Sequence, residues 1–264
     1  MDDAAHRPFY DEYAWAYDLL VPPLDAGQID FIVDSFGRRG AGAGSLVLDA
    51  GCGAGAYALE LARRGYAVEG VDRSPRLVAE ARMRADGART GGAHGLTVSF
   101  EVGDILKLPA SGRYGGILCR GVLNDLLDGR SRDAAFGSFA RSLRSGGVVV
   151  LDVREWEATA RRKIREPVFE KTVLTPRGAL TFRSVTRVDP GTRRLLVEER
   201  HTLKEPGGAE RVAAYDFQMR CWTLEELGAR LARAGFAGVE FYGAYDTETP
   251  AGTTDRLVCV ASRD

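Results

Sequence analysis

The sequence has few of the residues that cross-link a chain or bind structural metals. It contains only four cysteines and three histidines in 264 residues. The cysteines are Cys52, Cys119, Cys221 and Cys259, and the histidines are His6, His94 and His201. The cysteines are widely spaced without a CxxC pair, and the histidines do not stand at metal-ligand spacing. We therefore expect reduced, packed thiols and no metal site.

Long apolar runs and an excess of one charge are also absent. No segment is long enough to span a bilayer, and the opening residues MDDAAHRPFY have no apolar signal core. Lys and Arg number 36 and Asp and Glu 37, a net charge of −1, with no run of like charge. A nucleic-acid surface usually shows as a basic excess. These absences predict a cytoplasmic protein that binds neither nucleic acid nor a membrane.

What is present is an alternation of strand and helix patterns that starts at Leu46. A Gly/Ala-rich stretch, GRRGAGAGS, separates it from an N-terminal helical region, so we place a helical lid and linker at 1–44 and the core at 45–264. LVLDA is a continuously apolar strand, and AVEGVD, LTVSFEVGD, GGILCRG and VVVLDV follow it. Helices are predicted at 56–64, from Ser74 with Pro75 in the first turn, and from Ser131 to about 144. This alternation predicts an open, mostly parallel α/β sheet.

The rhythm changes between 167 and 220. Extended segments of period two are broken there by TPRG, DPGT and EPGG, which are turn signals. They predict a small antiparallel β insertion after the fifth strand. Thr223 and Glu226 then form a capping box for a helix that ends near Gly235. Two last strands, near 239–245 and 257–261, complete seven strands in the main sheet.

The stretch VLDAGCGAGAYALELARRGYAVEGVDRS raises the question of the cofactor. Gly51, Gly53 and Gly55 allow a tight turn from strand to helix and a close approach of backbone N–H groups to a ligand. Asp72, at the end of the second strand, can accept hydrogen bonds from ribose hydroxyls. The same outline serves a nicotinamide dinucleotide, a flavin or S-adenosylmethionine. A P-loop is excluded because no Lys-Ser/Thr pair follows the glycines.

Two further acidic residues favour S-adenosylmethionine. Asp49 directly precedes the glycine turn, where a carboxylate would repel a pyrophosphate but attract the ammonium group of an amino-acid cofactor. Asp104 follows the third strand and can accept a hydrogen bond from an adenine amino group.

In order and spacing, VLDAGCGAG, VEGVDRSP, FEVGDILKLP and GGILCRGVLNDL resemble the successive motifs of class I S-adenosylmethionine-dependent methyltransferases. The resemblance covers about 47–153 and extends weakly to both ends through YDEYAWAYDLL and DRLVCVASRD. It implies a Rossmann-like, mostly parallel seven-stranded sheet whose final strand is antiparallel. It also implies S-adenosylmethionine as cofactor, with S-adenosylhomocysteine as product.

The resemblance assigns cofactor-binding roles to several residues. Asp49 and the three glycines would line the methionine end, and Asp72 would hold the ribose. The remaining cofactor-side residues are Arg73, Asp104 and Ile105 around the adenine, Arg120 and Gly121 beneath the methionine, and Tyr17 over the cofactor. For Tyr17, an aromatic position on a core helix is the alternative.

Candidates for positioning the acceptor follow the fourth and fifth strands. Asn124 and Asp125 lie in the loop that would face the methyl group, with capping of the next helix as the alternative. Arg154 in LDVREWE resembles the arginine of the D-x-R-N-Y phrase of glycine N-methyltransferase-like enzymes. His201 and Tyr215, on the inserted segment, are interpreted as packing or surface residues.

The β insertion resembles that of small-molecule N-methyltransferases, including those acting on aminosugars in natural-product pathways, where it roofs the active site or forms a dimer interface. We therefore expect methyl transfer to a nitrogen or oxygen of a small metabolite. The alternatives are an NAD(P)-dependent oxidoreductase and a non-catalytic methyltransferase-like binding protein.

Overall fold

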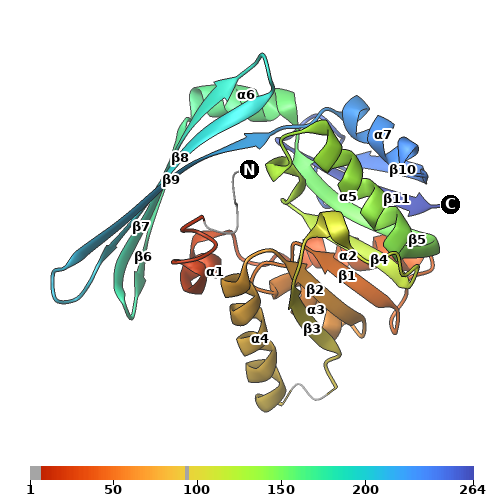
Figure 1. Ribbon diagram of the computed structural model, residues 1–264, viewed down its shortest axis with the longest axis horizontal. Coiled ribbons are helices and arrows are strands. Elements are labelled where there is room, and N and C mark those ends of the chain that lie inside the picture. Colours follow the sequence, from red (N-terminus) through yellow and green to blue (C-terminus); the bar gives the residue numbers. More distant parts are fainter. Residues whose placement is uncertain (1–6, 93–94) are drawn as a thin grey trace.

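The computed structural model describes residues 7–92 and 95–264. Two sheets are present among these residues (Figure 1). The main sheet has seven strands in the order β10-β11-β5-β4-β1-β2-β3, and a second sheet has four strands in the order β6-β7-β8-β9. The predicted α/β class, the seven-stranded main sheet and the antiparallel β insertion are confirmed.

The main sheet is parallel except at one strand. Its members are β1 (Leu46–Ala50), β2 (Ala67–Asp72), β3 (Val98–Val102), β4 (Tyr114–Arg120), β5 (Leu143–Arg154), β10 (Phe236–Tyr242) and β11 (Arg256–Arg263). The final strand β11 runs antiparallel to both β5 and β10, between which it lies. The chain order reverses between β1 and β4, so the carboxyl ends of these strands leave a crevice of the kind that binds ligands in open α/β sheets.

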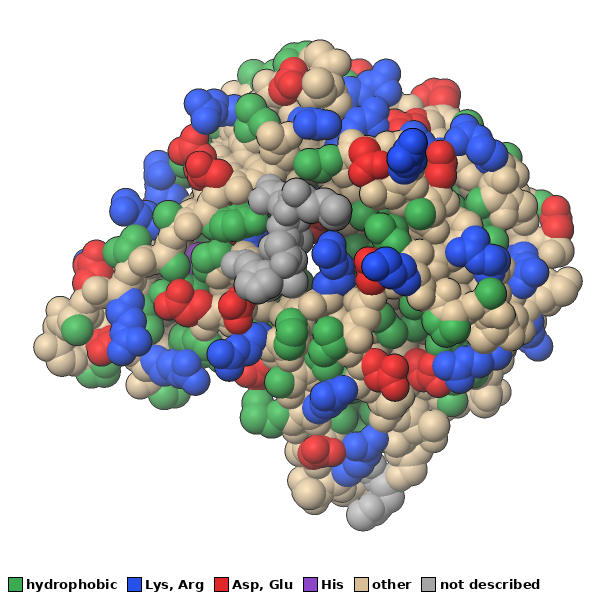
Figure 2. Space-filling view, viewed as in Figure 1, with side chains coloured by type: hydrophobic (Ala, Val, Ile, Leu, Met, Phe, Trp, Pro, Cys, Tyr) green, Lys and Arg blue, Asp and Glu red, His purple; other side chains and the backbone are tan. Residues whose placement is uncertain are grey.

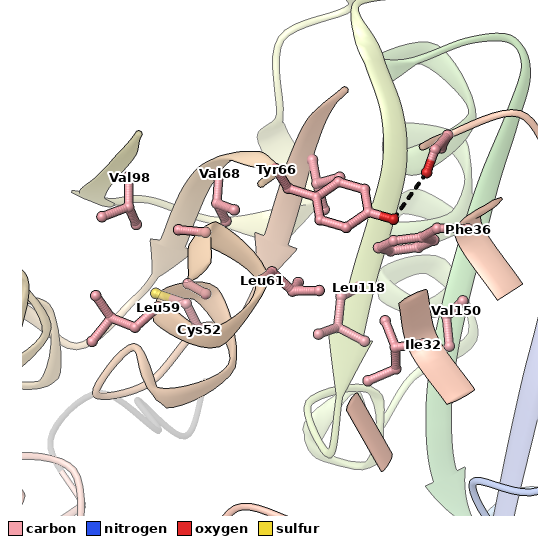
Figure 3. Packing of buried hydrophobic residues seen from close by; sticks show 14 of the residues in the cluster. Ile32, Phe36, Cys52, Leu59, Leu61, Tyr66, Val68, Val98, Leu118 and Val150 are labelled. Carbon is pink, nitrogen blue, oxygen red and sulfur yellow. Dashed lines mark hydrogen bonds between the residues drawn. The ribbon is translucent and has the colours of Figure 1, made fainter. Parts of the chain in front are cut away.

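Helices cover both faces of this sheet. On one face lie α2 (Ala26–Arg38), α3 (Ala56–Arg63) and α4 (Pro75–Thr90), and on the other lie α5 (Gly129–Ser142) and α7 (Leu224–Arg233). Figure 3 shows the first layer, in which Ile32 and Phe36 of α2 pack against Leu118 and Val150 of the sheet. Beside them Tyr66 donates a hydrogen bond of 3.2 Å to the carbonyl of Ala41. Within 1–44, α2 therefore belongs to the core packing.

The helix predicted from Ser131 to about 144 has different ends. Asp128 caps α5, because its carboxylate accepts a hydrogen bond of 2.9 Å from the Ser131 backbone N–H. The helix therefore begins two residues earlier, at Gly129, and ends at Ser142, because Leu143 already pairs with Tyr114 of β4. Asp128 also removes the alternative that Asn124 or Asp125 caps this helix.

Other helix ends follow their local chemistry. Ser74 caps α4 with Pro75 in its first turn, as predicted. Thr223 caps α7 by accepting a hydrogen bond of 3.2 Å from the Glu226 backbone N–H. The Glu226 carboxylate pairs with Arg132, Arg220 and Arg230. Of the two strands predicted at the end of the chain, the first was expected near 239–245. It forms three residues earlier, as β10.

No helix was predicted between the fifth strand and the insertion, but α6 (Trp156–Arg165) forms there. Glu155 caps it by accepting hydrogen bonds from the backbone N–H groups of Glu157 and Ala158. The second sheet then follows as β6 (Val168–Thr175), β7 (Gly178–Asp189), β8 (Arg194–Lys204) and β9 (Glu210–Arg220). It projects from the core in Figure 1, with α6 beside it.

The chain leaves the core and returns to it at one place. Backbone hydrogen bonds join Trp222, just after β9, to the end of β5: its N–H donates to the Arg154 carbonyl at 2.9 Å, and its carbonyl accepts from the Trp156 N–H at 2.8 Å. The Trp222 ring is fully buried, and its indole N–H donates to the Leu123 carbonyl at 3.3 Å. The inserted sheet is thus anchored where it begins and where it ends.

Short helical turns complete the N-terminal region. Residues 7–20, here called the N-terminal segment, contain η2 (Ala14–Ala16) and α1 (Tyr17–Leu20). In Figure 1, α1 lies between the projecting sheet and the core. Aromatic contacts support this placement, since Phe9 stacks on Phe182 of β7 with ring centroids 5.3 Å apart.

The four cysteines are all buried and unpaired, as expected. Among the described residues no helix could cross a membrane, and no group of three or more His, Cys, Asp or Glu is placed to hold a metal ion. His6 and His94 lie outside the described residues. On the face shown in Figure 2, basic and acidic side chains are intermingled over both the core and the projecting sheet.

Candidate active site

The glycine turn joins β1 to α3 at the carboxyl edge of the main sheet. Gly51, Gly53 and Gly55 all have positive φ, of 84°, 53° and 81°. A Cβ atom on Gly51 would lie 2.1 Å from Cγ2 of Val122, which belongs to the loop after β4. Both the backbone conformation and this close approach therefore require glycine at position 51.

Asp72 holds this turn in place from the end of β2. Its Oδ2 accepts a hydrogen bond of 2.9 Å from the Gly53 N–H, and its Oδ1 accepts one of 2.8 Å from the Ser74 N–H. Burial raises the pKa of Asp72, and these backbone N–H groups work against that rise by stabilising the carboxylate. The predicted ribose-binding residue and a predicted glycine therefore lie side by side.

Asp49 is the penultimate residue of β1 and lies just before the glycine turn. Asp49 is 3% exposed, and its Oδ2 has no hydrogen-bond partner among the residues described. Burial raises its pKa to about 7, although the positive charge of Arg120 acts in the opposite direction. A buried acceptor without a donor costs free energy, of about 1–3 kcal/mol and more when it is charged. An N–H donor or a cationic group of a ligand would remove this cost.

Arg120 and Gly121 end β4. The Arg120 guanidinium lies 3.7 Å above the Tyr57 ring and donates hydrogen bonds to the Tyr245 hydroxyl at 2.9 Å and to Gln28 at 3.0 Å. The Gly121 N–H donates to Asp152 at 2.7 Å, and Gly121 has a φ of 70°. These bonds fix the end of β4 beside the glycine turn.

Tyr17 approaches the turn from the N-terminal segment. Its Cε1 lies 3.8 Å from the position that a Cβ on Gly53 would occupy. Burial raises the pKa of Tyr17 to about 12, and the nearby charge of Asp72 adds to the rise. The structure thus brings Tyr17, Gly53 and Asp72 together.

The residues expected around the adenine are less uniformly placed. Asp104 follows β3 and caps a short 3-10 turn, η3 (Ile105–Lys107), by accepting a hydrogen bond of 3.0 Å from the Leu106 N–H. Ile105 is 3% exposed and belongs to the buried cluster beneath the sheet. Arg73 is exposed beside Asp72, and its charge acts on that carboxylate.

Beyond β4, the candidates for positioning an acceptor separate into two kinds. Asn124 is 3% exposed and is held by backbone, since its Oδ1 accepts a hydrogen bond of 3.0 Å from the Arg154 N–H and its Nδ2 donates to the Gly121 carbonyl at 3.4 Å. It therefore ties the end of β4 to the end of β5. The Arg154 side chain remains partly exposed, with Asp255 3.9 Å away.

Asp125 ends the short turn η4 (Leu123–Asp125), directly after the loop that follows β4. Burial raises its pKa to about 6, while the positive charges of Arg7 and Arg154 oppose the rise. At neutral pH it is therefore mostly ionised, and the charges of these two cations act on it.

Sequence patterns did not predict a polar group on the inner face of the second sheet. Glu199 of β8 pairs with Arg7, from the other end of the chain, with an N–O distance of 2.7 Å, and both side chains are buried. His201, two residues along the same face, is fully buried and stacks on Tyr13 with ring centroids 4.6 Å apart. The available signal was a charged residue on the apolar face of an alternating strand.

Comparison with known proteins identifies what this crevice serves. Residues 47–147 match the family model described as a methyltransferase domain. The matched region runs from β1 to β5 and contains the glycine turn, Asp49 and Asp72. Residues 47–147 form a methyltransferase domain, and the chain has the fold of class I S-adenosylmethionine-dependent methyltransferases. The interpretation as an NAD(P)-dependent oxidoreductase is thereby set aside.

Individual methyltransferases match this chain over most of its length. A protein named as a methyltransferase from Geobacillus sp. (strain WCH70) is 26% identical over 262 residues, which is 96% of this chain and 99% of that protein. An S-adenosylmethionine-dependent methyltransferase from Clostridium acetobutylicum has the same fold, with a TM-score of 0.77, 16% identity, and coverage of 96% of this chain and 98% of that one. The amino pentose methyltransferase CalS10 of calicheamicin biosynthesis, from Micromonospora echinaspora, was solved with S-adenosylmethionine bound. It gives a TM-score of 0.67 at 23% identity, covering 91% of this chain and 92% of that one.

The cofactor of this methyltransferase is S-adenosylmethionine. When bound, it supplies a methyl group on a sulfonium, which is an excellent leaving group. The side chains present fit it, because the unpartnered Asp49 oxygen suits the ammonium group and the glycine turn leaves room for close approach of a ligand. The residues that would hold it are Tyr17, Asp49, Gly51, Gly53, Gly55, Asp72, Arg73, Asp104, Ile105, Arg120 and Gly121.

Proposed function

We propose that this methyltransferase transfers the methyl group to a nitrogen or oxygen atom of a small metabolite, in a natural-product pathway. The observation that carries the proposal is the pair of opposite charges beyond β4, Asp125 and Arg154. Asp125 is free of helix capping and ionised near neutral pH, while Arg154 stands at the end of β5. Together they provide an acceptor and a donor for a polar metabolite where β4 and β5 end.

Methyl transfer depends largely on holding the nucleophile in line with the methyl carbon. A hydroxyl acceptor needs a base within reach, whereas an amine needs only to arrive unprotonated. Asp125 suits either acceptor, because its carboxylate can accept a hydrogen bond from O–H or N–H. Asn124 acts by fixing the positions of Gly121 and Arg154, and Arg154 orients the acceptor.

The peripheral elements complete the site in this proposal. The N-terminal region, residues 1–44, contributes a lid through the segment 7–20, and the insertion 167–220 is a roof over the acceptor. The exposed apolar residues Val168, Phe169 and Leu174 on the edge strand β6 support a second role in a homodimer, which light scattering coupled to size exclusion tests. Four unpaired thiols support a cytoplasmic location.

The proposal is tested by incubating the protein with S-adenosylmethionine that carries an isotope-labelled methyl group and a panel of amino sugars, hydroxylated sugars and small amines. A labelled product identifies the acceptor class, and the chemical shift of the new methyl carbon separates N- from O-methylation. Asp125→Asn should then lower turnover at least tenfold with little change in S-adenosylhomocysteine affinity. Asp86→Asn, on the exposed side of α4, is the matched control and should leave both unchanged.

Three results contradict this proposal. The first is transfer of label only to nucleic acid or protein. The second is turnover of Asp125→Asn equal to that of the wild type. The third, binding of S-adenosylhomocysteine with no labelled product from any acceptor, would favour a non-catalytic methyltransferase-like binding protein.

A further inference from the structure

The N-terminal segment is held by both the inserted sheet and the core. On the sheet side Phe9 and Tyr13 stack on Phe182 and His201. On the core side lies Ser74, two residues after Asp72. Its hydroxyl donates a hydrogen bond of 2.5 Å to the Tyr10 carbonyl. The segment is therefore the direct link between the roof and the cofactor side of the crevice.

Arg7 is the charged group at the start of this link. Its Nη2 and Nε donate to the two carboxylate oxygens of Glu199 at 2.7 and 3.3 Å. The guanidinium lies 3.7 Å above the Phe217 ring of β9 and 4.4 Å from the centroid of the Tyr10 ring. Arg7 and Glu199 are 5% exposed each, so both charges are shielded from water in the intact pair.

A bidentate pair held between two aromatic rings fixes the guanidinium in orientation as well as position. Tyr10, which covers one side of Arg7, is the residue whose carbonyl is bound by Ser74. Seven residues further along, Tyr17 lies against Gly53 of the glycine turn. Movement of Arg7 away from Glu199 would thus loosen the segment at the residues that approach the cofactor.

We propose that Arg7 is a positioning residue for the cofactor. By pairing with Glu199 it fastens the N-terminal segment to the inserted sheet and so holds Tyr10 and Tyr17 over the glycine turn. Release of this pair opens the segment and lets S-adenosylhomocysteine leave. The acceptor roof and the cofactor site are coupled through one ion pair between residues 192 positions apart.

The test measures S-adenosylhomocysteine binding by titration calorimetry, its dissociation rate, and hydrogen exchange of the backbone over 8–20. Arg7→Ala should raise the dissociation constant at least tenfold, chiefly through faster dissociation, and should speed exchange in this segment. Glu199→Gln keeps the side-chain shape and should act in the same direction, so the test survives if Arg7→Ala fails to fold. Arg7→Lys, which retains a cation over the two rings, should recover some of the affinity.

Arg76→Ala is the matched control. Arg76 pairs with Asp11 of the same segment at 3.3 Å, but its side chain is 73% exposed, so binding should stay within twofold of wild type. The double variant Arg7→Ala/Glu199→Gln should bind no more weakly than Arg7→Ala alone. Wild-type affinity in folded Arg7→Ala and Glu199→Gln would overturn the proposal, as would equal losses in Arg76→Ala. Because only S-adenosylhomocysteine is used, the outcome is independent of the identity of the methyl acceptor.

Discussion

The backbone N–H of Gly53 donates a hydrogen bond of 2.9 Å to the carboxylate of Asp72, so the acidic residue that ends β2 fixes the turn that follows β1. Since the other oxygen of Asp72 accepts from Ser74, this carboxylate binds two loops before it binds any ligand. Its effect on the cofactor is therefore partly indirect, through the conformation of the turn.

Asp72→Asn should weaken both the fold and the cofactor site. An amide offers one acceptor oxygen where the carboxylate offers two, so either the Gly53 or the Ser74 N–H would face an NH₂ group. We expect a loss of about 1–3 kcal/mol in the free energy of unfolding and at least a tenfold weaker S-adenosylhomocysteine complex. Denaturant unfolding and calorimetry measure the two effects. Asp86→Asn serves as the control, and unchanged binding in Asp72→Asn would be evidence against this role.

Cofactor binding should depend on the ionisation of Asp49. Its pKa is raised to about 7 by burial, and a bound ammonium group would lower it again. Affinity for S-adenosylhomocysteine should therefore rise with pH up to about 7 and then level off, by roughly tenfold between pH 6 and pH 8. In Asp49→Asn this dependence should disappear, because the amide does not titrate. A pH profile identical in wild type and variant would show that the ammonium group lies elsewhere.

Gly51→Ala should be strongly disruptive. The residue has a φ of 84°, and a Cβ would lie 2.1 Å from Val122. We expect destabilisation of about 1–3 kcal/mol together with loss of S-adenosylhomocysteine binding. Gly42→Ala is the matched control, because a Cβ at Gly42 meets nothing within 4 Å. Equal melting temperatures of the two variants would contradict this expectation.

His201→Phe should preserve or increase stability. Within the described residues neither ring nitrogen has a hydrogen-bond partner, and burial lowers the pKa of His201 to about 4. The imidazole is therefore neutral in the folded protein, and its contribution to stability is complete above its unfolded pKa near 6.5 and is lost as pH falls toward 4. Phe keeps the stacking on Tyr13 and removes two unpaired nitrogens, a gain of about 1 kcal/mol. Thermal unfolding of wild type and variant between pH 4 and pH 7 would show a smaller loss of stability in acid for the variant.

Much of the core was predictable because its signals are local. The apolar strand, the glycines and Asp72 lie within 26 residues of one another. The two neighbouring residues Ser74 and Pro75 are enough to indicate the start of α4. The insertion was also predictable, since its turns contain TPRG, DPGT and EPGG and its strands alternate. The end of α5 was placed wrongly because the pairing of Leu143 with Tyr114 takes the residues that the helix pattern would continue into.

The rest depended on contacts that no local pattern contains. The pair between Arg7 and Glu199 joins the two ends of the sequence, and neither residue stands in a recognisable motif. Likewise α6 is a short, strongly basic helix that buries only Trp156, Thr159 and Ala160, a face too small to mark a helix in the sequence. Helix propensity and periodicity do not determine such features, which follow from tertiary packing.

The join at Trp222 has a further consequence. Because the chain departs after β5 and re-enters beside it, the intervening residues contribute no strand to the main sheet and no bond to its register. Their length and composition can therefore change through evolution while the nucleotide crevice keeps its shape. An enzyme built this way can acquire a new acceptor by exchanging the insert alone, provided that the contact with the amino-terminal residues is rebuilt with it.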